Sequence, residues 1–323
     1  MRRVSATPLR WPIMIVALAG GTGAAKLLRG LSGIIEPSRL VVVGNTGDDF
    51  ECWSLHVSPD LDSVTYALAG LLDREKGWGV AGDTFRCLDA MRRFGGLTWF
   101  QLGDRDLATH LFRTERLRGG ATLSAATGAI TGALGVAARL IPMSDDPVRT
   151  RLLTPSGWLG LQEFFVRERA RPAVREITYA GADVARPAAG AVEAVQDAEA
   201  IVVCCSNPVT SIAPILAVPG MVPALRETSA PVVADSPIIG DAPVSGPAGQ
   251  LLQTRGLPVS AASIAELYRP WLDVLVVDHT DAGLAPEIAA RGVRAVTAET
   301  LMTDAASERA LARAVLDAAG VRP

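Results

Sequence analysis

The chain has 323 residues, of which 49% are hydrophobic and 20% charged, and its formal net charge at pH 7 is -3. This composition is typical of a globular protein with a large core, and the length fits one large domain or two ordinary ones. The charge balance argues against a nucleic-acid-binding protein or a membrane-surface protein, because both need concentrated basic charge. The four cysteines form no Cys-x-x-Cys pair, so we expect reduced thiols and a cytoplasmic location.

The N-terminal segment has some features of a secretion signal. Two arginines, Arg2 and Arg3, precede an apolar run, and Ala17-Leu18-Ala19 resembles a cleavage site. However, Pro12 opens that run, and cleavage would split a continuous strand–turn–helix pattern. We therefore expect residues 1–11 to form a loose leader. No apolar run is long enough to span a membrane.

A strand–helix–strand unit is predicted first along the chain. Residues 13–19 form an apolar run of strand length, the glycine-rich residues 20–23 predict a turn, and residues 24–31 predict a helix. Residues 40–43 predict a second buried strand, which requires a right-handed crossover.

The next region, from residue 61 to about 140, has helix-spaced apolar residues that often follow Asp, Ser or Thr caps. Repeated strands are absent from its pattern. We therefore predict a helical insertion over residues 63–140.

The second half of the chain returns to strands. Alternation around Pro155-Ser156-Gly157 predicts a β-hairpin, and VREITYAG predicts a further strand. Buried-strand patterns then recur, with helical segments between several of them. The fold class predicted for residues 1–323 is a single α/β domain: a doubly wound, mostly parallel Rossmann-like sheet with the helical insertion and a small hairpin.

Ligands of such sheets bind beyond the carboxyl ends of the strands. Four of the predicted strands end in residues that suit backbone contact with phosphate and recognition of hydroxyls. These residues are Gly20, Gly21, Thr22 and Gly23; Asn45 to Asp49; Ser206 and Asn207; and Ser236 and Pro237. Together they indicate a nucleotide site.

The glycine loop would let backbone N–H groups approach an anion at the positive end of the following helix. Lys26 is expected in the first turn of that helix, within reach of a phosphate. The loop lacks the P-loop pattern, and Lys26 stands where a dinucleotide fingerprint would have its third glycine. Taken alone, the loop is also compatible with a simple strand-to-helix turn.

Two pairs of carboxylates follow the second strand, Asp48 with Asp49 and Asp60 with Asp62. Mg²⁺ takes one or two carboxylates together with phosphate oxygens and waters, so these pairs suit a magnesium–phosphate site. The alternative is that Asp60 and Asp62 cap a helix that begins near Ser63.

Two further motifs suit ligand binding. Arg105, in GDRDLATH, can bind a phosphate or stack on a planar ring, or it can simply belong to a helix start. The stretch SPIIGDAPVSGPAG, residues 236–249, has too many prolines and glycines for a long helix or a central strand, so we expect a shaped binding loop.

Several motifs, in order, resemble the 2-phospho-L-lactate transferase family from about Met14 to the final helix. They are GGTGAAKLLRGL, NTGDD, SPDLDSVTYALAG, KGWGV, LGDRDLATHL, MSDDPV, SNPVTSIAPILAVPG and SPIIGDAPVSGPAG. The combination of SPDLD, GDRD and SPIIG…SGPAG is specific. The resemblance implies an Mg²⁺-dependent transfer of a 2-phospholactyl or phosphoenolpyruvyl group from a guanosine diphosphate-linked donor to the deazaflavin Fo. GMP leaves, the product belongs to coenzyme F-420 biosynthesis, and a homodimer is expected.

The resemblance also implies roles for individual residues. The diphosphate would be held by Gly20, Gly21, Thr22, Gly23 and Lys26, and the guanosine side by Ser206, Asn207, Ser236, Pro237 and Gly246. Asp49 and Asp62 would bind the metal and orient the attacking hydroxyl. Asp62, Arg105 and Trp78 would contact Fo beneath the helical insertion.

Two alternatives stay open at this point. A non-catalytic nucleotide-sugar-binding regulator of the same fold would keep the glycine loop but not SPDLD and GDRDLATH. An NAD(P)-dependent dehydrogenase would have the third glycine. The sequence does not distinguish lactate, enolpyruvate and glycerate as the three-carbon acid, and we favour enolpyruvate by analogy with bacterial chains.

Overall fold

A computed structural model describes residues 14–322, so the expected leader and the signal-like Arg2 and Arg3 lie outside the described residues. The molecule is built around a seven-stranded parallel sheet with the strand order β14-β13-β10-β9-β1-β2-β5. Its strands are β1 (Ile15–Ala19), β2 (Leu40–Gly44), β5 (Arg139–Pro142), β9 (Ala200–Val203), β10 (Val232–Asp235), β13 (Val274–Asp278) and β14 (Arg294–Ala298). The predicted doubly wound α/β fold is confirmed.

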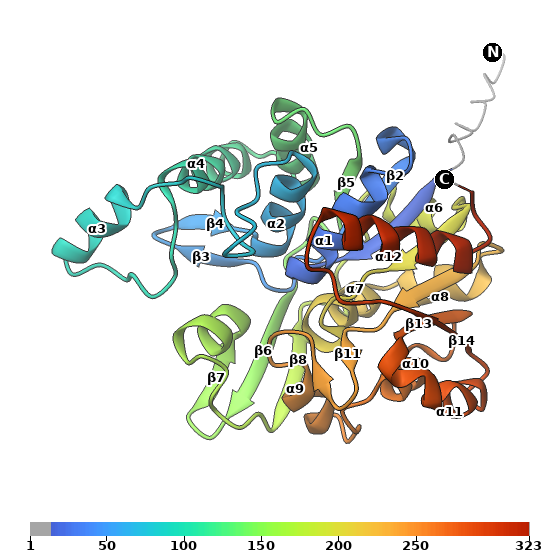
Figure 1. The fold of residues 1–323 in the computed structure, drawn as a ribbon. Helices are drawn as coiled ribbons and strands as arrows, with labels where there is room; N and C mark the ends of the chain where they lie inside the picture. The colour runs from blue at the N-terminus through green and yellow to red at the C-terminus, as the bar shows by residue number, and fades with distance from the viewer. Residues whose placement is uncertain (1–13, 323) are drawn as a thin grey trace, which may run out of the picture.

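Helices cover both faces of this sheet (Figure 1). The side chains of strand β1 contribute to hydrophobic cores on both faces: Ile15 and Ala17 belong to one core, and Val16 and Leu18 belong to the other. Alternate side chains of a strand point to opposite faces, so a strand buried on both sides is apolar throughout.

Four helices pack on the face of the sheet that carries Ile15 and contribute to its hydrophobic core: α1 (Gly21–Ser32), α2 (Pro59–Leu68), α5 (Leu123–Ala133) and α12 (Ala305–Ala318). The core of Val16 is closed by α6 (Ala191–Gln196), α7 (Ala213–Ala217), α8 (Met221–Glu227), α9 (Ala248–Thr254), α10 (Ala261–Tyr268) and α11 (Ala285–Ala289). Short helical turns are η1 (Pro37–Arg39), η2 (Glu163–Arg167), η3 (Pro208–Ile212) and η4 (His279–Leu284).

The segment between β2 and β5 contains the predicted helices, with α3 (Arg86–Arg93) and α4 (Asp104–Arg118) between α2 and α5. It also contains a hairpin that the sequence pattern did not predict, β3 (Phe50–Cys52) with β4 (Leu55–Val57). The hairpin turn is made by Trp53 and Ser54, both with positive φ. Such turns normally use glycine or asparagine, so neither residue indicated one.

A second projecting unit follows β5. The predicted hairpin is confirmed as β6 (Arg149–Thr154) with β7 (Gly157–Gly160), and β8 (Glu176–Ala180) pairs with the other side of β6. In Figure 1 this unit and the α3–β3–β4 region extend from the same side of the central sheet. They approach each other where the Arg167 guanidinium carbon lies 5.9 Å from the Trp99 ring centroid.

The residues after β10 form a shaped loop, as predicted, stiffened by the two-residue strands β11 (Ile238–Ile239) and β12 (Ala242–Pro243). All four cysteines are free, which confirms the expectation of thiols. Among residues 14–322, no single helix is long and apolar enough to cross a membrane. Two neighbouring helical segments, Pro208–Ala217 and Met221–Glu227, reach the length and apolar composition of a membrane span only when they are taken together. They are bent by 88° at the break between them.

Candidate active site

The loops after β9, β1 and β2 meet at the carboxyl edge of the sheet. The backbone N–H of Gly20 donates to Ser206 Oγ at 3.3 Å. The Asn45 amide donates to Asp60 Oδ2 at 2.8 Å and to the Thr210 carbonyl at 3.2 Å. Three of the strand ends predicted to carry ligand-binding residues are therefore joined directly by hydrogen bonds.

The glycines of the first loop are needed for close packing. A Cβ on Gly20 would lie 2.2 Å from Asp60 Oδ2, and one on Gly23 would lie 2.4 Å from the Cys205 carbonyl oxygen. Gly21 has φ +74°, which L-residues with side chains rarely adopt. The loop is therefore pressed between the end of β9 and the start of α2.

Helix α1 begins at Gly21, three residues earlier than predicted, and no side chain caps its N-terminus. The N–H groups of Gly21, Thr22 and Gly23 lie in its first turn, where a helix leaves backbone donors without intrahelical partners. An uncapped N-terminus with small residues is a ready site for a phosphate.

Lys26 lies in the second turn of α1, not in the first as expected, because the helix starts at Gly21. Its ammonium group donates to the Met302 carbonyl at 2.9 Å. In this structure Lys26 thus joins α1 to the segment that leads into α12.

Asp60 is the carboxylate that lies against the glycine loop. It is buried, and so is Asp48, which accepts a hydrogen bond from Gln162 Nε2 at 3.1 Å. Burial raises the pKa of Asp60 to about 6, and burial together with the Asp60 charge raises the pKa of Asp48 well above its usual range. Burial and mutual repulsion therefore both disfavour the state in which the two carboxylates are charged at once.

Asp49 has a different environment. Its Oδ2 accepts from His56 Nε2 at 2.8 Å and from Ser58 Oγ at 3.0 Å. Its Oδ1 is buried and has no hydrogen-bond partner within the described part of the chain. A buried carboxylate oxygen without a partner is able to accept a hydrogen bond from a hydroxyl or to bind a cation.

Asp49 lines a cleft of about 230 Å³ between the loops after β2 and β5. The other lining residues are Thr46, His56, Leu117, Leu123, Asp145, Asp146, Pro147 and Arg149. Sequence reasoning missed His56 and Arg149, since neither belongs to a motif with a recognisable spacing.

Asp62 belongs to a buried network between α2 and α4. Arg113 binds it with two nitrogens, one of them 3.1 Å from Oδ2. His110 lies 3.6 Å from Asp62 and 3.3 Å from Asp106, and Asp106 accepts from the Tyr66 hydroxyl at 2.7 Å. Ligand atoms of Asp62, Asp106 and His110 are all within 4.8 Å of one another, close enough to hold a metal ion.

A magnesium ion prefers oxygen ligands. Asp49 fits this requirement because its Oδ1 is buried and has no partner among residues 14–322. Asp62 fits it less well, because a guanidinium already engages both of its oxygens. Of the two predicted metal ligands, the structure therefore favours Asp49.

The polar residues after β9 and β10 shape their own loops. Asn207 caps η3 through bonds from Val209 N and Thr210 N. Ser236 Oγ exchanges hydrogen bonds with the backbone of Ile238, next to Pro237. Gly246 has φ +70° and faces the Phe165 ring. The loops of Asn207 and Ser236 thus adopt fixed shapes at the carboxyl edge.

The loop that contains Trp78 reaches the glycine loop. A Cβ on Gly77 would lie 2.7 Å from the Thr22 methyl group, so these two segments touch. Trp78 is 38% exposed and packs edge-on against Phe85. Arg105 is exposed near the start of α4, with its guanidinium 3.4 Å from the Ala81 carbonyl. Of the three predicted Fo contacts, Trp78 and Arg105 therefore have accessible side chains, whereas Asp62 is buried against Arg113.

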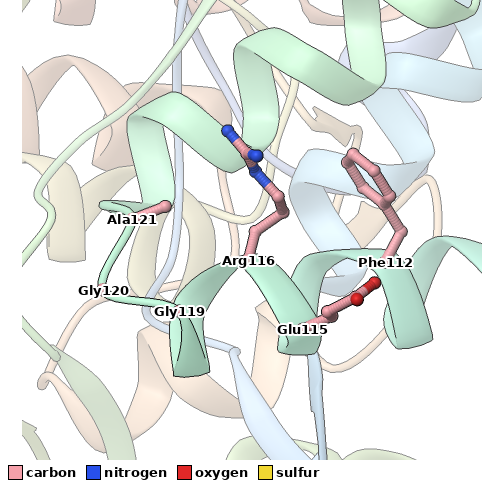
Figure 2. Close-up of a pocket in the computed structure, with 6 residues that line it drawn as sticks. All are labelled: Phe112, Glu115, Arg116, Gly119, Gly120 and Ala121. Atoms are coloured by element: carbon pink, nitrogen blue, oxygen red, sulfur yellow. The ribbon is translucent and has the colours of Figure 1, made fainter.

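A larger hollow of about 570 Å³ lies where α4 turns into α5 (Figure 2). It is lined by Phe112, Glu115, Arg116, Gly119, Gly120 and Ala121, and it shares no residue with the cleft of Asp49. Its charged side chains, Glu115 and Arg116, are exposed to solvent. We assign it no part in the site.

The fold and site together define a doubly wound α/β protein with a glycine loop at an uncapped helix start beside buried carboxylates. The chain belongs to the 2-phospho-L-lactate transferase CofD family, whose model matches residues 15–318. It is thus a member of a transferase family.

Two relatives illustrate the family. A phosphoenolpyruvate transferase of Streptomyces griseus is 43% identical over 311 residues, covering 94% of this chain and 98% of the relative. A 2-phospho-L-lactate transferase of Methanosarcina acetivorans is 42% identical over 302 residues, with the same two shares. A crystal structure of a UPF0052 family member from Bacillus halodurans has a TM-score of 0.64 at 14% identity, covering 95% of this chain and 99% of that one. The latter likeness concerns the fold alone.

Proposed function

We propose that this protein transfers a phosphoenolpyruvyl or 2-phospholactyl group from a guanosine diphosphate-linked donor to the deazaflavin Fo. The terminal ribityl hydroxyl of Fo attacks the phosphorus that bears the three-carbon acid. The bond from this phosphorus to the bridging oxygen breaks, GMP leaves with that oxygen, and the hydroxyl proton passes to a carboxylate. The product is coenzyme F-420 without its glutamate tail, or its dehydro form.

The observation that carries this proposal is the contact between the glycine loop and the acidic loops beside it. The uncapped start of α1 suits the donor diphosphate, and the loops of Ser206, Asn207, Ser236 and Gly246 suit its guanosine side. Phosphoryl transfer requires mainly positioning and charge stabilisation, which this edge of the sheet supplies.

Asp49 is the favoured catalytic residue because its Oδ1, which has no partner among the residues that the structure describes, can accept the hydroxyl proton or hold a metal. Bound Mg²⁺ would supply charge neutralisation on the transferred phosphoryl group. The His56 and Ser58 bonds fix the other oxygen of Asp49 and so orient the carboxylate.

Fo would lie beneath the helical segment, near Trp78 and Arg105. The contact between Gly77 and Thr22 supports this placement, since it brings the loop of Trp78 to the donor loop. Asp62 lies in the first turn of α2, where Arg113 holds its carboxylate. From this position it would act on the bound substrates.

The test is to incubate the purified protein with Fo, Mg²⁺ and each guanosine diphosphate-linked acid, and to identify the products by mass spectrometry. We expect a phosphodiester of Fo and stoichiometric GMP. Tight binding of a nucleotide sugar, with no binding of Fo, would instead support a non-catalytic regulator of the same fold.

A further inference from the structure

The cleft of Asp49 contains a cation, Arg149, that forms no ion pair with an acidic residue within the described part of the chain. Among residues 14–322, Arg149 donates hydrogen bonds to two carbonyl oxygens, those of Val148 at 2.8 Å and Thr46 at 3.4 Å. Arg149 is half-buried. An arginine fork matches a carboxylate or phosphate in a two-point geometry, and carbonyls alone leave that capacity unused.

The cleft has three carboxylates, and none of them forms an ion pair with Arg149 in the described structure: Asp49 accepts from His56 and Ser58. Asp145 accepts from the Ser124 N–H at 2.7 Å. Asp146 accepts from the Arg186 N–H at 2.9 Å and from its side chain at 3.4 Å. The positive charge of Arg149 therefore remains available to an incoming anion.

A second group in the cleft also lacks a partner. Thr46 is 1% exposed, and its hydroxyl has no hydrogen-bond partner in the described structure. The Thr46 carbonyl is already bound by Arg149, so the hydroxyl and the guanidinium belong to one small region. The Thr46 hydroxyl and the N–H groups of Arg149 that are not bound to carbonyls are donors suited to the two oxygens of a carboxylate.

The covalent structure of the proposed donor determines where its carboxylate lies relative to the reacting phosphorus. In a 2-phospho acid, the carbon that bears the phosphate ester also bears the carboxyl group, so the carboxylate lies next to the reacting phosphorus. If Asp49 faces that phosphorus, the carboxylate must enter the cleft that Asp49 lines. A cleft of about 230 Å³ is smaller than typical drug-sized pockets, which begin at about 300 Å³, so it suits a three-carbon acid better than a nucleoside or a deazaflavin.

We propose that Arg149 and Thr46 bind the carboxylate of the three-carbon acid on the donor. This inference rests on the proposed function and assigns a specificity-determining role to both residues. Leu117 and Leu123 line the same cleft and give the third carbon an apolar wall.

The experiment compares two donors by calorimetry and in the transfer assay: the natural guanosine diphosphate-linked acid, and its analogue with the carboxylate replaced by a neutral carboxamide. We expect wild-type protein to prefer the acid, and Arg149→Gln to lose roughly 10- to 100-fold in affinity for the acid, as for a charge-assisted hydrogen bond. The same variant should bind the amide much as wild type does. Thr46→Val should show a smaller loss in the same direction.

Arg186→Gln is the matched control, because it removes an exposed arginine that pairs with Asp146 at the same cleft. It should leave the preference for the acid unchanged. Equal losses for both donors in Arg149→Gln, or no loss, would overturn the inference. Preferential binding of the acid without transfer to Fo would instead contradict the proposed function and leave the assignment of Arg149 intact.

Discussion

Arg113 and Asp62 form a two-point ion pair inside the contact between α2 and α4, where 2% and 6% of their side-chain surfaces are exposed. The same guanidinium lies 3.5 Å from the His56 carbonyl, and the His56 ring holds Asp49. Arg113 thus connects Asp62 to the orientation of Asp49. It also neutralises Asp62 without any metal, so loss of either partner leaves a buried charge.

Replacement of Asp62 by alanine should therefore destabilise the protein by about 3–5 kcal/mol, the usual cost of breaking a buried pair. The double variant Asp62→Leu with Arg113→Met should recover most of this loss, because no unpaired charge remains. Urea denaturation of the single and double variants measures both effects. Wild-type stability in Asp62→Ala, combined with loss of transfer, would show that Asp62 acts directly on the substrates.

Asp49→Asn should behave differently. Asparagine keeps an oxygen that accepts from Ser58, so we expect the free energy of unfolding to change by no more than about 1 kcal/mol. Transfer to Fo should fall by at least about 100-fold, as for loss of a general base. Asp146→Asn is the control, since it lines the same cleft but pairs with the exposed Arg186. Near wild-type turnover in Asp49→Asn would remove Asp49 from the mechanism.

The central fold could be predicted from the sequence because its strands are short apolar runs buried on both faces. The β3–β4 hairpin could not, because Trp53 and Ser54 adopt positive φ without glycine or asparagine. Such a turn is imposed by the surrounding packing, including the small core of Cys52, Val57 and Leu102.

The site could be predicted only in outline. The sequence indicated that carboxylates lie near the glycine loop, but not which ones. Helix α2 begins at Pro59, so Asp60 and Asp62 both lie in its first turn, two positions apart and on different sides of the helix. Asp60 consequently faces Gly20, while Asp62 faces Arg113 on α4. Arg113 follows Asp62 by 51 residues in the sequence, and no local sequence pattern predicts an ion pair over that separation.

Gly20→Ala tests the packing of the glycine loop. The new Cβ would lie 2.2 Å from Asp60 Oδ2 and 2.8 Å from Ser211 Cβ, and both of these groups are buried. We expect a loss of about 1–3 kcal/mol, as in other overpacked sites, together with weaker donor binding in calorimetry. Gly128→Ala in α5 is the control: nothing lies within 4 Å of its Cβ, and alanine there should stabilise the helix by up to about 1 kcal/mol. Equal stabilities of the two variants would contradict the close contact between Gly20 and Asp60.

Asp235 predicts a pH dependence of stability. It is buried at the end of β10, no N–H or O–H group in residues 14–322 donates to either of its oxygens, and the Cys205 thiol lies beside it. Burial, with a smaller effect of the Asp278 charge, raises its pKa to about 8. The folded protein therefore keeps a proton that the unfolded chain, with its ordinary aspartate pKa near 3.8, has already released.

Between about pH 4 and about pH 8 the unfolded state thus binds fewer protons, so the contribution of Asp235 to stability falls as the pH rises, by up to about 1.4 kcal/mol per pH unit. Asp235→Asn cannot ionise and should flatten this slope. Urea denaturation near pH 5 and near pH 8 measures the difference, with the exposed Asp183→Asn as control. Parallel slopes for Asp235→Asn and wild type would mean that Asp235 is already ionised in the folded protein, and that the end of β10 holds a charge which an unidentified group must compensate.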